Sequence, residues 1–251
     1  MNVDIYERVD TLKTAIAAAR PFEGHMLQQL KAYYRVGLTW TSNALEGNSL
    51  TEAETKILLE DGLTVGGKPL RDTYEALGHA EAYDYMFGLI SERQISLDDI
   101  LKMHNLFYTT IDAQNAGIWR NVSIVVTGTD YVFPAPKELD SLMSNLNQWI
   151  ISERDKLHPV KFAAMLHLKF VTIHPFVDGN GRVARLLMNT ALIQDGFMLA
   201  IVPPVLRQEY MDAIRVYQQK GLSDRFCDFI AERVIETEKD VIRLFHIPNP
   251  Y

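Results

Sequence analysis

Apolar residues recur along most of the chain at the three- and four-residue intervals of amphipathic helices. The first two such stretches run from 3 to 19, ending before Pro21, and from about 25 until Gly47 and Asn48 interrupt the pattern. Capping boxes at Thr51 and Ser96 indicate two more helix starts. Further helices are expected over about 137–153, 159–173, 182–195, 207–219 and 224–245. The pattern predicts a mainly α-helical fold.

The segment 122–134 departs from the helical period. Residues 123–126 are rich in β-branched side chains, Gly128 is typical of a turn, and 131–133 form a second short apolar run. We expect one β-hairpin here, which needs support from the helices because an isolated hairpin is marginal in water. The sequence pattern alone fits a surface hairpin without a function as well as a functional hairpin.

Composition restricts the class of partner and of compartment. Thirty-two acidic against 25 basic residues give a formal charge of −7, so nucleic acid is not an expected partner. The single cysteine, Cys227, cannot form an internal disulfide, which suits a reducing compartment. The N-terminus is charged from its fourth residue and no run of about 18 apolar residues lacks a charge. We expect no export signal, no membrane contact and a cytoplasmic location.

Two strongly apolar helices flank the short polar loop 178–181. Its glycines, Gly179 and Gly181, permit backbone conformations that turn several N–H groups toward one point, next to the positive end of a helix dipole. Arg182 and Arg185 lie three residues apart at that helix start, and guanidinium groups bind phosphate oxygens bidentately. The loop is therefore predicted to bind a nucleotide polyphosphate.

Asp178 would be repelled by bare phosphates but could ligate a bridging Mg²⁺. Other known binding motifs do not fit the spacing of residues in this region. A calcium loop would place Phe176 and Leu187 where carboxylates are required, and the sequence has no P-loop, dinucleotide-binding or zinc motif. His167 is expected to be a core histidine. His174 lies between a buried helix and the anion-binding loop, which favours a functional role.

The segment 174–185, HPFVDGNGRVAR, resembles the complete signature of the Fic-domain proteins, HPFx[DE]GNGRxxR, at every fixed position. Similarity extends to GIWRNVSIVVTG from Gly117 and to the stretch around Tyr210, over about residues 40–240. The resemblance implies a Fic-type helical bundle with a β-hairpin flap. It also implies an N-terminal helical region at 1–95, a core at 96–200 and completing helices at 201–251.

The resemblance implies transfer of AMP from ATP to a Tyr, Thr or Ser hydroxyl of a protein target, this chain included. A hydroxyl with a pKa of about 10 or more needs a base, and His174 is the candidate. Mg²⁺ on Asp178, together with Arg182 and Arg185, would stabilise the leaving pyrophosphate. Phe176 is expected to be a structural anchor. Nucleotide contacts are expected from Gly179, Asn180, Gly181 and Tyr210.

Two more elements follow from the resemblance. Ser42 and Glu46 match the inhibitory motif [ST]xxxE[GN], in which the glutamate pairs with the second arginine, here Arg185. Some relatives with this motif also remove AMP from the target. The flap is expected to dock a target segment by backbone pairing. Its docking residues would be Val126, Thr127, Gly128, Thr129, Val132 and Phe133.

Three alternatives remain open at the level of sequence. The chain could be a nucleotide-responsive binding protein without chemistry, although the intact His174 argues against this. It could be a Fic enzyme with another donor such as UTP. The amphipathic helix 224–245 either closes the core or meets a second copy in a homodimer.

Overall fold

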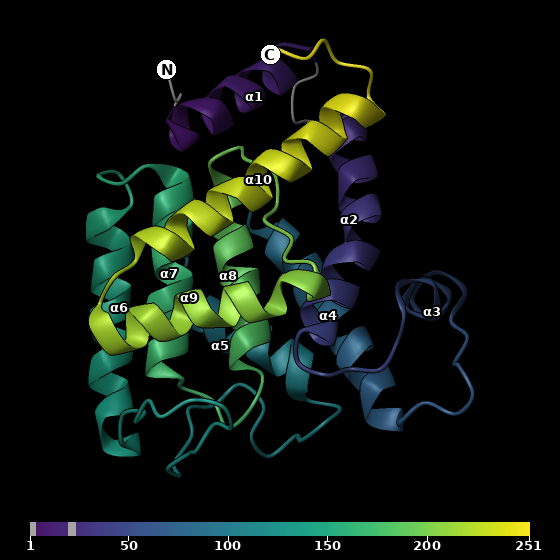
Figure 1. Cartoon of the computed structure of the whole chain (residues 1–251). Helices are drawn as coiled ribbons and strands as arrows, with labels where there is room; N and C mark the ends of the chain where they lie inside the picture. The colour runs from purple at the N-terminus through teal and green to yellow at the C-terminus, as the bar shows by residue number, and fades with distance from the viewer. Residues whose placement is uncertain (1–3, 20–23) are drawn as a thin grey trace.

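The computed structural model describes residues 4–19 and 24–251, which are mainly helical (Figure 1). The expected helix limits at 3 and Pro21 lie outside the described residues. The helices are α1 (Ile5–Ala19), α2 (Gly24–Ala44), α3 (Glu52–Lys56), α4 (Leu70–Gly88), α5 (Leu97–Tyr108), α6 (Leu139–Glu153), α7 (Pro159–Ile173), α8 (Asn180–Gln194), α9 (Arg207–Lys220) and α10 (Asp224–Leu244), with single turns at η1 (Ile57–Asp61), η2 (Pro136–Glu138) and η3 (Pro204–Leu206).

Both capping boxes are confirmed. The hydroxyl of Thr51 accepts a hydrogen bond from the N–H of Glu54, and Ser96 and Asp99 form the same arrangement at the start of α5. Each box satisfies two of the backbone donors that a helix start leaves free. The residue patterns at these positions therefore define where α3 and α5 begin.

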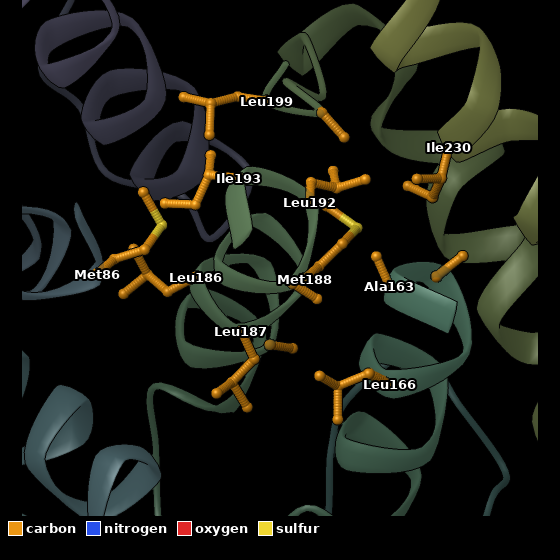
Figure 2. Packing of buried hydrophobic residues seen from close by; sticks show 14 of the residues in the cluster. Met86, Ala163, Leu166, Leu186, Leu187, Met188, Leu192, Ile193, Leu199 and Ile230 are labelled. Carbon is orange, nitrogen blue, oxygen red and sulfur yellow. The ribbon is translucent and has the colours of Figure 1, made fainter. Parts of the chain in front are cut away.

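Helix α8 is buried on nearly every side. Its apolar side chains point in several directions, toward Met86 of α4, Ala163 of α7 and Ile230 of α10 (Figure 2). Full burial of one such side chain contributes about 1.5–3 kcal/mol. Because α8 packs against α4, α7, α5 and α2, its N-terminus is held in a fixed position, and the glycine-containing loop leads directly into it.

Most buried apolar side chains of the described residues form one large hydrophobic core, beside a small second cluster of Leu50, Leu58 and Ala76. Buried residues from 1–95, 96–200 and 201–251 belong to the large core, and α10 packs against both α1 and α7. The helix 224–245 thus closes the core in this chain. Within the described residues, no helix combines the length and the hydrophobicity needed to cross a membrane.

The expected β-hairpin is wrong. Residues 122–134 form two irregular arms around a turn at Thr127 and Gly128, without strand pairing in this described segment. The arms are joined instead through Arg120, whose guanidinium donates to the carbonyl oxygens of Val122 at 2.9 Å and of Pro134 at 2.7 Å. An arginine side chain therefore holds the base of this loop in place of a β ladder.

Candidate active site

His174 is placed with one ring nitrogen available to a ligand. It caps the C-terminus of α7 in the left-handed conformation, with φ 54°, which is uncommon outside glycine. Its Nδ1 lies 3.2 Å from the carbonyl oxygen of Val171. A proton on Nδ1 makes this contact a hydrogen bond, so Nε2 keeps a free lone pair. Figure 1 places this end of α7 beside the loop that enters α8.

The environment keeps the His174 imidazole neutral. Burial lowers its pKa to about 4, and the hydrogen bond to Val171 and the charge of Glu46 oppose this only in part. A neutral imidazole can accept a proton at pH 7. The phosphates of a bound nucleotide would add negative charge nearby and favour the protonated product of that transfer.

The loop before α8 is shaped by its own side chains. The Asn180 side chain accepts a hydrogen bond from the Phe176 N–H and donates one to the Phe176 carbonyl, both at 2.9 Å. The Asn180 side chain is therefore bonded to the loop itself, and its expected contact with a nucleotide stays a prediction. The main-chain N–H groups at the start of α8 have no partner within the helix and remain the groups suited to an anion.

Phe176 is fully buried, as an anchor would be, and its ring stacks on His104 at 3.6 Å between centroids. The His104 ring also accepts a hydrogen bond from the Gly117 N–H at Nδ1, while its Nε2 lies 3.1 Å from the Asp178 carbonyl. Gly179 has φ 79°, and a Cβ there would come within 2.8 Å of Phe107. A side chain at this position would therefore displace the loop.

The side chains of Arg182 and Arg185 project from the start of α8 into different surroundings. Arg182 pairs with Glu75 at 3.0 Å and with Asp178 at 3.3 Å. Arg71 closes a ring of charges with the same two carboxylates, at 2.6 Å from Asp178 and 3.1 Å from Glu75. This polar pocket also includes Asn48. The first arginine is thus neutralised by acids of the protein itself.

Arg185 is 2% exposed and is bonded mainly to the end of α2. Its Nη2 lies 2.8 Å from the Glu46 carboxylate, its Nε donates to the Ser42 hydroxyl at 2.9 Å, and Nη2 also donates to the Ser42 carbonyl. Burial alone would raise the pKa of Glu46, but the charges of Arg185 and Arg182 outweigh it and lower that pKa. Glu46 is therefore an anion at neutral pH.

Tyr210 contributes to the same pocket from α9. Its hydroxyl lies 2.6 Å from Nε2 of His167 and 3.3 Å from Nη1 of Arg185. His167 is fully buried and stacks on Phe226. The Tyr210 hydroxyl is thus occupied by protein partners, while the residue still lines the pocket.

One pocket brings most of the expected residues together, with a volume of about 110 Å³. It is smaller than the pockets of about 300–1,000 Å³ that enclose small-molecule ligands, and Glu46 lies in its wall. Val132 does not line it and is 86% exposed. The expected residues that line it are Glu46, Val126, Thr127, Gly128, Thr129, Phe133, His174, Gly181, Arg185 and Tyr210.

Asp178 is the candidate Mg²⁺ ligand. The described residues contain no group of three or more His, Cys, Asp or Glu side chains suited to a metal ion. Asp178 supplies one carboxylate beside the start of α8, and its side chain is 38% exposed. Mg²⁺ is commonly held by one or two carboxylates with water and substrate phosphates. Asp178 fits that mode, provided that Arg71 gives up its contact.

Sequence reasoning missed several residues of the site. Arg71 and Glu75 come from α4, about 100 positions before the loop they contact, and no local motif includes them. His104 and Arg120 were likewise overlooked. Arg120 lies two residues before the expected hairpin, and the signal available for it was the stretch GIWRNVSIVVTG that resembles the family.

The comparisons with known proteins agree with this geometry. Curated relatives named protein adenylyltransferase Fic from Drosophila melanogaster and Nematostella vectensis are 34% and 38% identical, over 90% and 78% of this chain. The chain spans 46% of the length of each of these relatives.

Two solved structures share the fold over nearly the whole chain. Fic-1 from C. elegans superposes with a TM-score of 0.85 at 26% identity, covering 96% of this chain and 73% of that one. A Fic domain containing signaling protein from Bacteroides thetaiotaomicron gives 0.84 at 25% identity, covering 97% and 100%. Residues 94–192 match the family model described as Fic/DOC family. The chain therefore contains a domain of the Fic/DOC family.

Proposed function

We propose that the chain transfers AMP from ATP to a hydroxyl group of a target protein. The observation that carries the proposal is a neutral His174, with Nε2 free, in one pocket with Arg185 and the start of α8. The relatives named above are called protein adenylyltransferases, which supports the same reaction. Mere nucleotide binding would not need a base at this position.

In the proposed step, Nε2 of His174 accepts the proton of the target hydroxyl. The oxygen forms a bond to the α-phosphorus, and the bond from that phosphorus to the bridging oxygen of the β-phosphate breaks. Pyrophosphate leaves with the electron pair. The N–H groups at the start of α8, with Arg182 and Arg185, stabilise the charge that develops on it.

Asp178 is the residue that would hold Mg²⁺. The ion supplies a Lewis acid that neutralises phosphate charge. Arg71 now occupies the Asp178 carboxylate, and Glu75 offers this guanidinium a second partner. Release of Arg71 toward Glu75 would free the carboxylate.

The same proposal includes autoinhibition by Glu46. Its carboxylate binds the guanidinium that the γ-phosphate would use, so productive ATP binding requires that this ion pair opens. A charge-assisted hydrogen bond contributes about 1.5–3 kcal/mol, or roughly 10- to 150-fold, less where solvent screens it. Glu46 is 35% exposed, so we expect the lower part of that range. Hydrolytic removal of AMP from the target, with Glu46 orienting a water, belongs to the same proposal.

The loop 123–133 is proposed to dock the target. Its main chain has no regular secondary structure on either side of the turn and no strand partner in the described segment, so its backbone groups can pair with a target segment. The docked hydroxyl would then lie near His174, since Phe133 contacts that ring at 4.5 Å. We propose a cytoplasmic location from the single cysteine, and self-association as a homodimer stays a prediction.

The test is transfer of radiolabel from α-labelled ATP with Mg²⁺, followed by mass spectrometry of the purified chain. We expect the Glu46→Gly chain to gain adenylyl groups and the Glu46→Gly, His174→Asn chain to gain none. Binding of ATP without transfer in the Glu46→Gly chain would instead support a nucleotide-responsive binding protein. Labelling from UTP in place of ATP would correct the donor.

A further inference from the structure

Arg120 is a buried cation whose partners are main-chain oxygens. Its residue is 3% exposed, and no ion pair to it occurs among the residues that the structure describes. The guanidinium donates to three carbonyl oxygens, those of Val122, Pro134 and His174, at 2.9, 2.7 and 2.8 Å. A cation buried without a carboxylate is costly unless its hydrogen bonds are satisfied. This arrangement therefore needs all three carbonyls in place.

The three carbonyls belong to two different parts of the site. Val122 and Pro134 flank the loop 123–133, so the two Nη atoms fix the distance between its ends. The Nε atom fixes the carbonyl of His174, the residue with the left-handed backbone. The main chain adds a fourth contact, from the Arg120 N–H to the Pro175 carbonyl at 2.9 Å. One side chain thus joins the candidate docking loop to the candidate base.

We propose that Arg120 is a positioning residue, which sets the docking loop and His174 in register with each other for AMP transfer. This inference rests on the proposed function. Arg120 does not line the pocket, so it acts through these two elements and not by contact with the nucleotide. Because guanidinium is a planar fork, it reaches three acceptors in fixed directions, which a lysine ammonium group on a flexible stem does not reproduce.

The Arg120 side chain holds the docking loop and His174, whereas other residues hold the loop that enters α8. The loop 178–181 before α8 is held by Asn180 and His104, and the Arg120 side chain contacts neither residue. Loss of the guanidinium fork should therefore loosen 123–133 and reduce transfer strongly. Affinity for ATP should fall by a much smaller factor, because the loop forms only part of the pocket wall and Arg185 and the start of α8 are unchanged. A purely structural arginine would lower thermal stability and affect all functions together.

The experiment compares Arg120→Lys and Arg120→Met in the Glu46→Gly chain. The matched control is Arg154→Lys, because Arg154 is also buried but bonds Gln194 and Asp195 at the far end of α8. Four quantities are measured: melting temperature, affinity for a fluorescent ATP analogue, rate of AMP transfer to the His174→Asn chain as acceptor in trans, and hydrogen exchange of 122–134.

For both Arg120 variants we expect transfer to fall about 10- to 100-fold, exchange of 122–134 to rise at least about 10-fold, and ATP affinity to fall by a much smaller factor than transfer. The control should keep transfer and loop exchange even where its melting temperature falls as much. Unchanged transfer and exchange in both variants, or a parallel loss of ATP affinity, would overturn the proposal. If the Glu46→Gly chain transfers no AMP, the proposed function is wrong. Hydrogen exchange of 122–134 in the Arg120 variants then still decides whether Arg120 fixes the loop.

Discussion

The carboxylate of Glu46 and the guanidinium of Arg185 meet at 2.8 Å across the junction of α2 and α8. Gly181 makes this approach possible, because a Cβ at that position would collide with the Glu46 carboxylate. Gly181, in the loop 178–181 that is predicted to bind phosphate, therefore leaves room for the ion pair as well as for a ligand. The same space cannot hold both the carboxylate and a phosphate oxygen.

Replacing Glu46 by glycine is expected to raise AMP transfer about 10-fold, since Arg185 loses its carboxylate and becomes free for phosphate. Initial rates of label incorporation from ATP measure this. Glu92→Gly provides the control, because Glu92 is an exposed glutamate in a turn away from the pocket. Equal rates for Glu46→Gly and the control would remove the inhibitory role.

His174→Asn is expected to lower transfer about 100- to 10,000-fold through loss of the base. Asparagine tolerates the left-handed backbone better than alanine, so the fold should be kept. Transfer is compared with affinity for an ATP analogue, which should stay within 2-fold. His158→Asn, an exchange of the N-cap residue of α7 at its opposite end, is the control. Wild-type transfer in the His174 variant would refute the catalytic assignment.

The acid limb of transfer is expected near pH 4–5 and not near the ordinary histidine value. Burial lowers the pKa of His174 to about 4, so the free enzyme keeps the neutral base as pH falls through 6.5. The pH profile of kcat/KM in the Glu46→Gly chain reports this value. A limb at 6.5 would show that the base titrates in a solvated environment.

Glu238→Gln is expected to stabilise the fold at neutral pH. Burial raises the pKa of Glu238 to about 9, and neither carboxylate oxygen has a hydrogen-bond partner within the described residues. The unfolded chain ionises this group above about pH 4.5 while the folded chain keeps the proton, so its contribution is full below 4.5 and is lost as pH rises toward 9. The variant should gain about 2–3 kcal/mol at pH 7 and almost nothing at pH 4.5.

Urea unfolding at both pH values measures the effect. Glu236→Gln, two residues away in α10 and paired with Lys239 at the surface, is the control and should show no gain. Equal stability of the Glu238 variant and the parent at pH 7 would show that the carboxyl group reaches water.

Removal of Mg²⁺ by EDTA is expected to stop transfer, and Arg71→Gln to lower the Mg²⁺ concentration for half-maximal rate several-fold. Arg71 competes for the Asp178 carboxylate in the structure. Arg93→Gln removes another exposed arginine with an aspartate partner, Asp155, and should change nothing. A Mg²⁺ requirement that is the same in both variants would separate Asp178 from the metal.

The sequence predicted those parts of the molecule that local pattern determines. The helices and capping boxes follow from residues within a few positions of each other, and the loop 174–185 is contiguous, so its fold could be inferred. The β-hairpin could not be judged locally, because strand pairing competes with the three bonds that Arg120 makes to carbonyl oxygens. Arg71 and Glu75 were missed for the same reason, since tertiary packing alone brings α4 to the phosphate loop.

The paired hydrogen bonds between Asn180 and the Phe176 main chain have a consequence for ligand affinity. Because folding itself sets the shape of this turn, an incoming anion meets donors that are already preorganised and loses no free energy in arranging them. Affinity for an anion there should depend on which protein carboxylates withdraw from the arginines beside the turn, and very little on the entropy of ordering the loop. Selection between nucleotides such as ATP and UTP must then come from the pocket walls that surround the rest of the ligand.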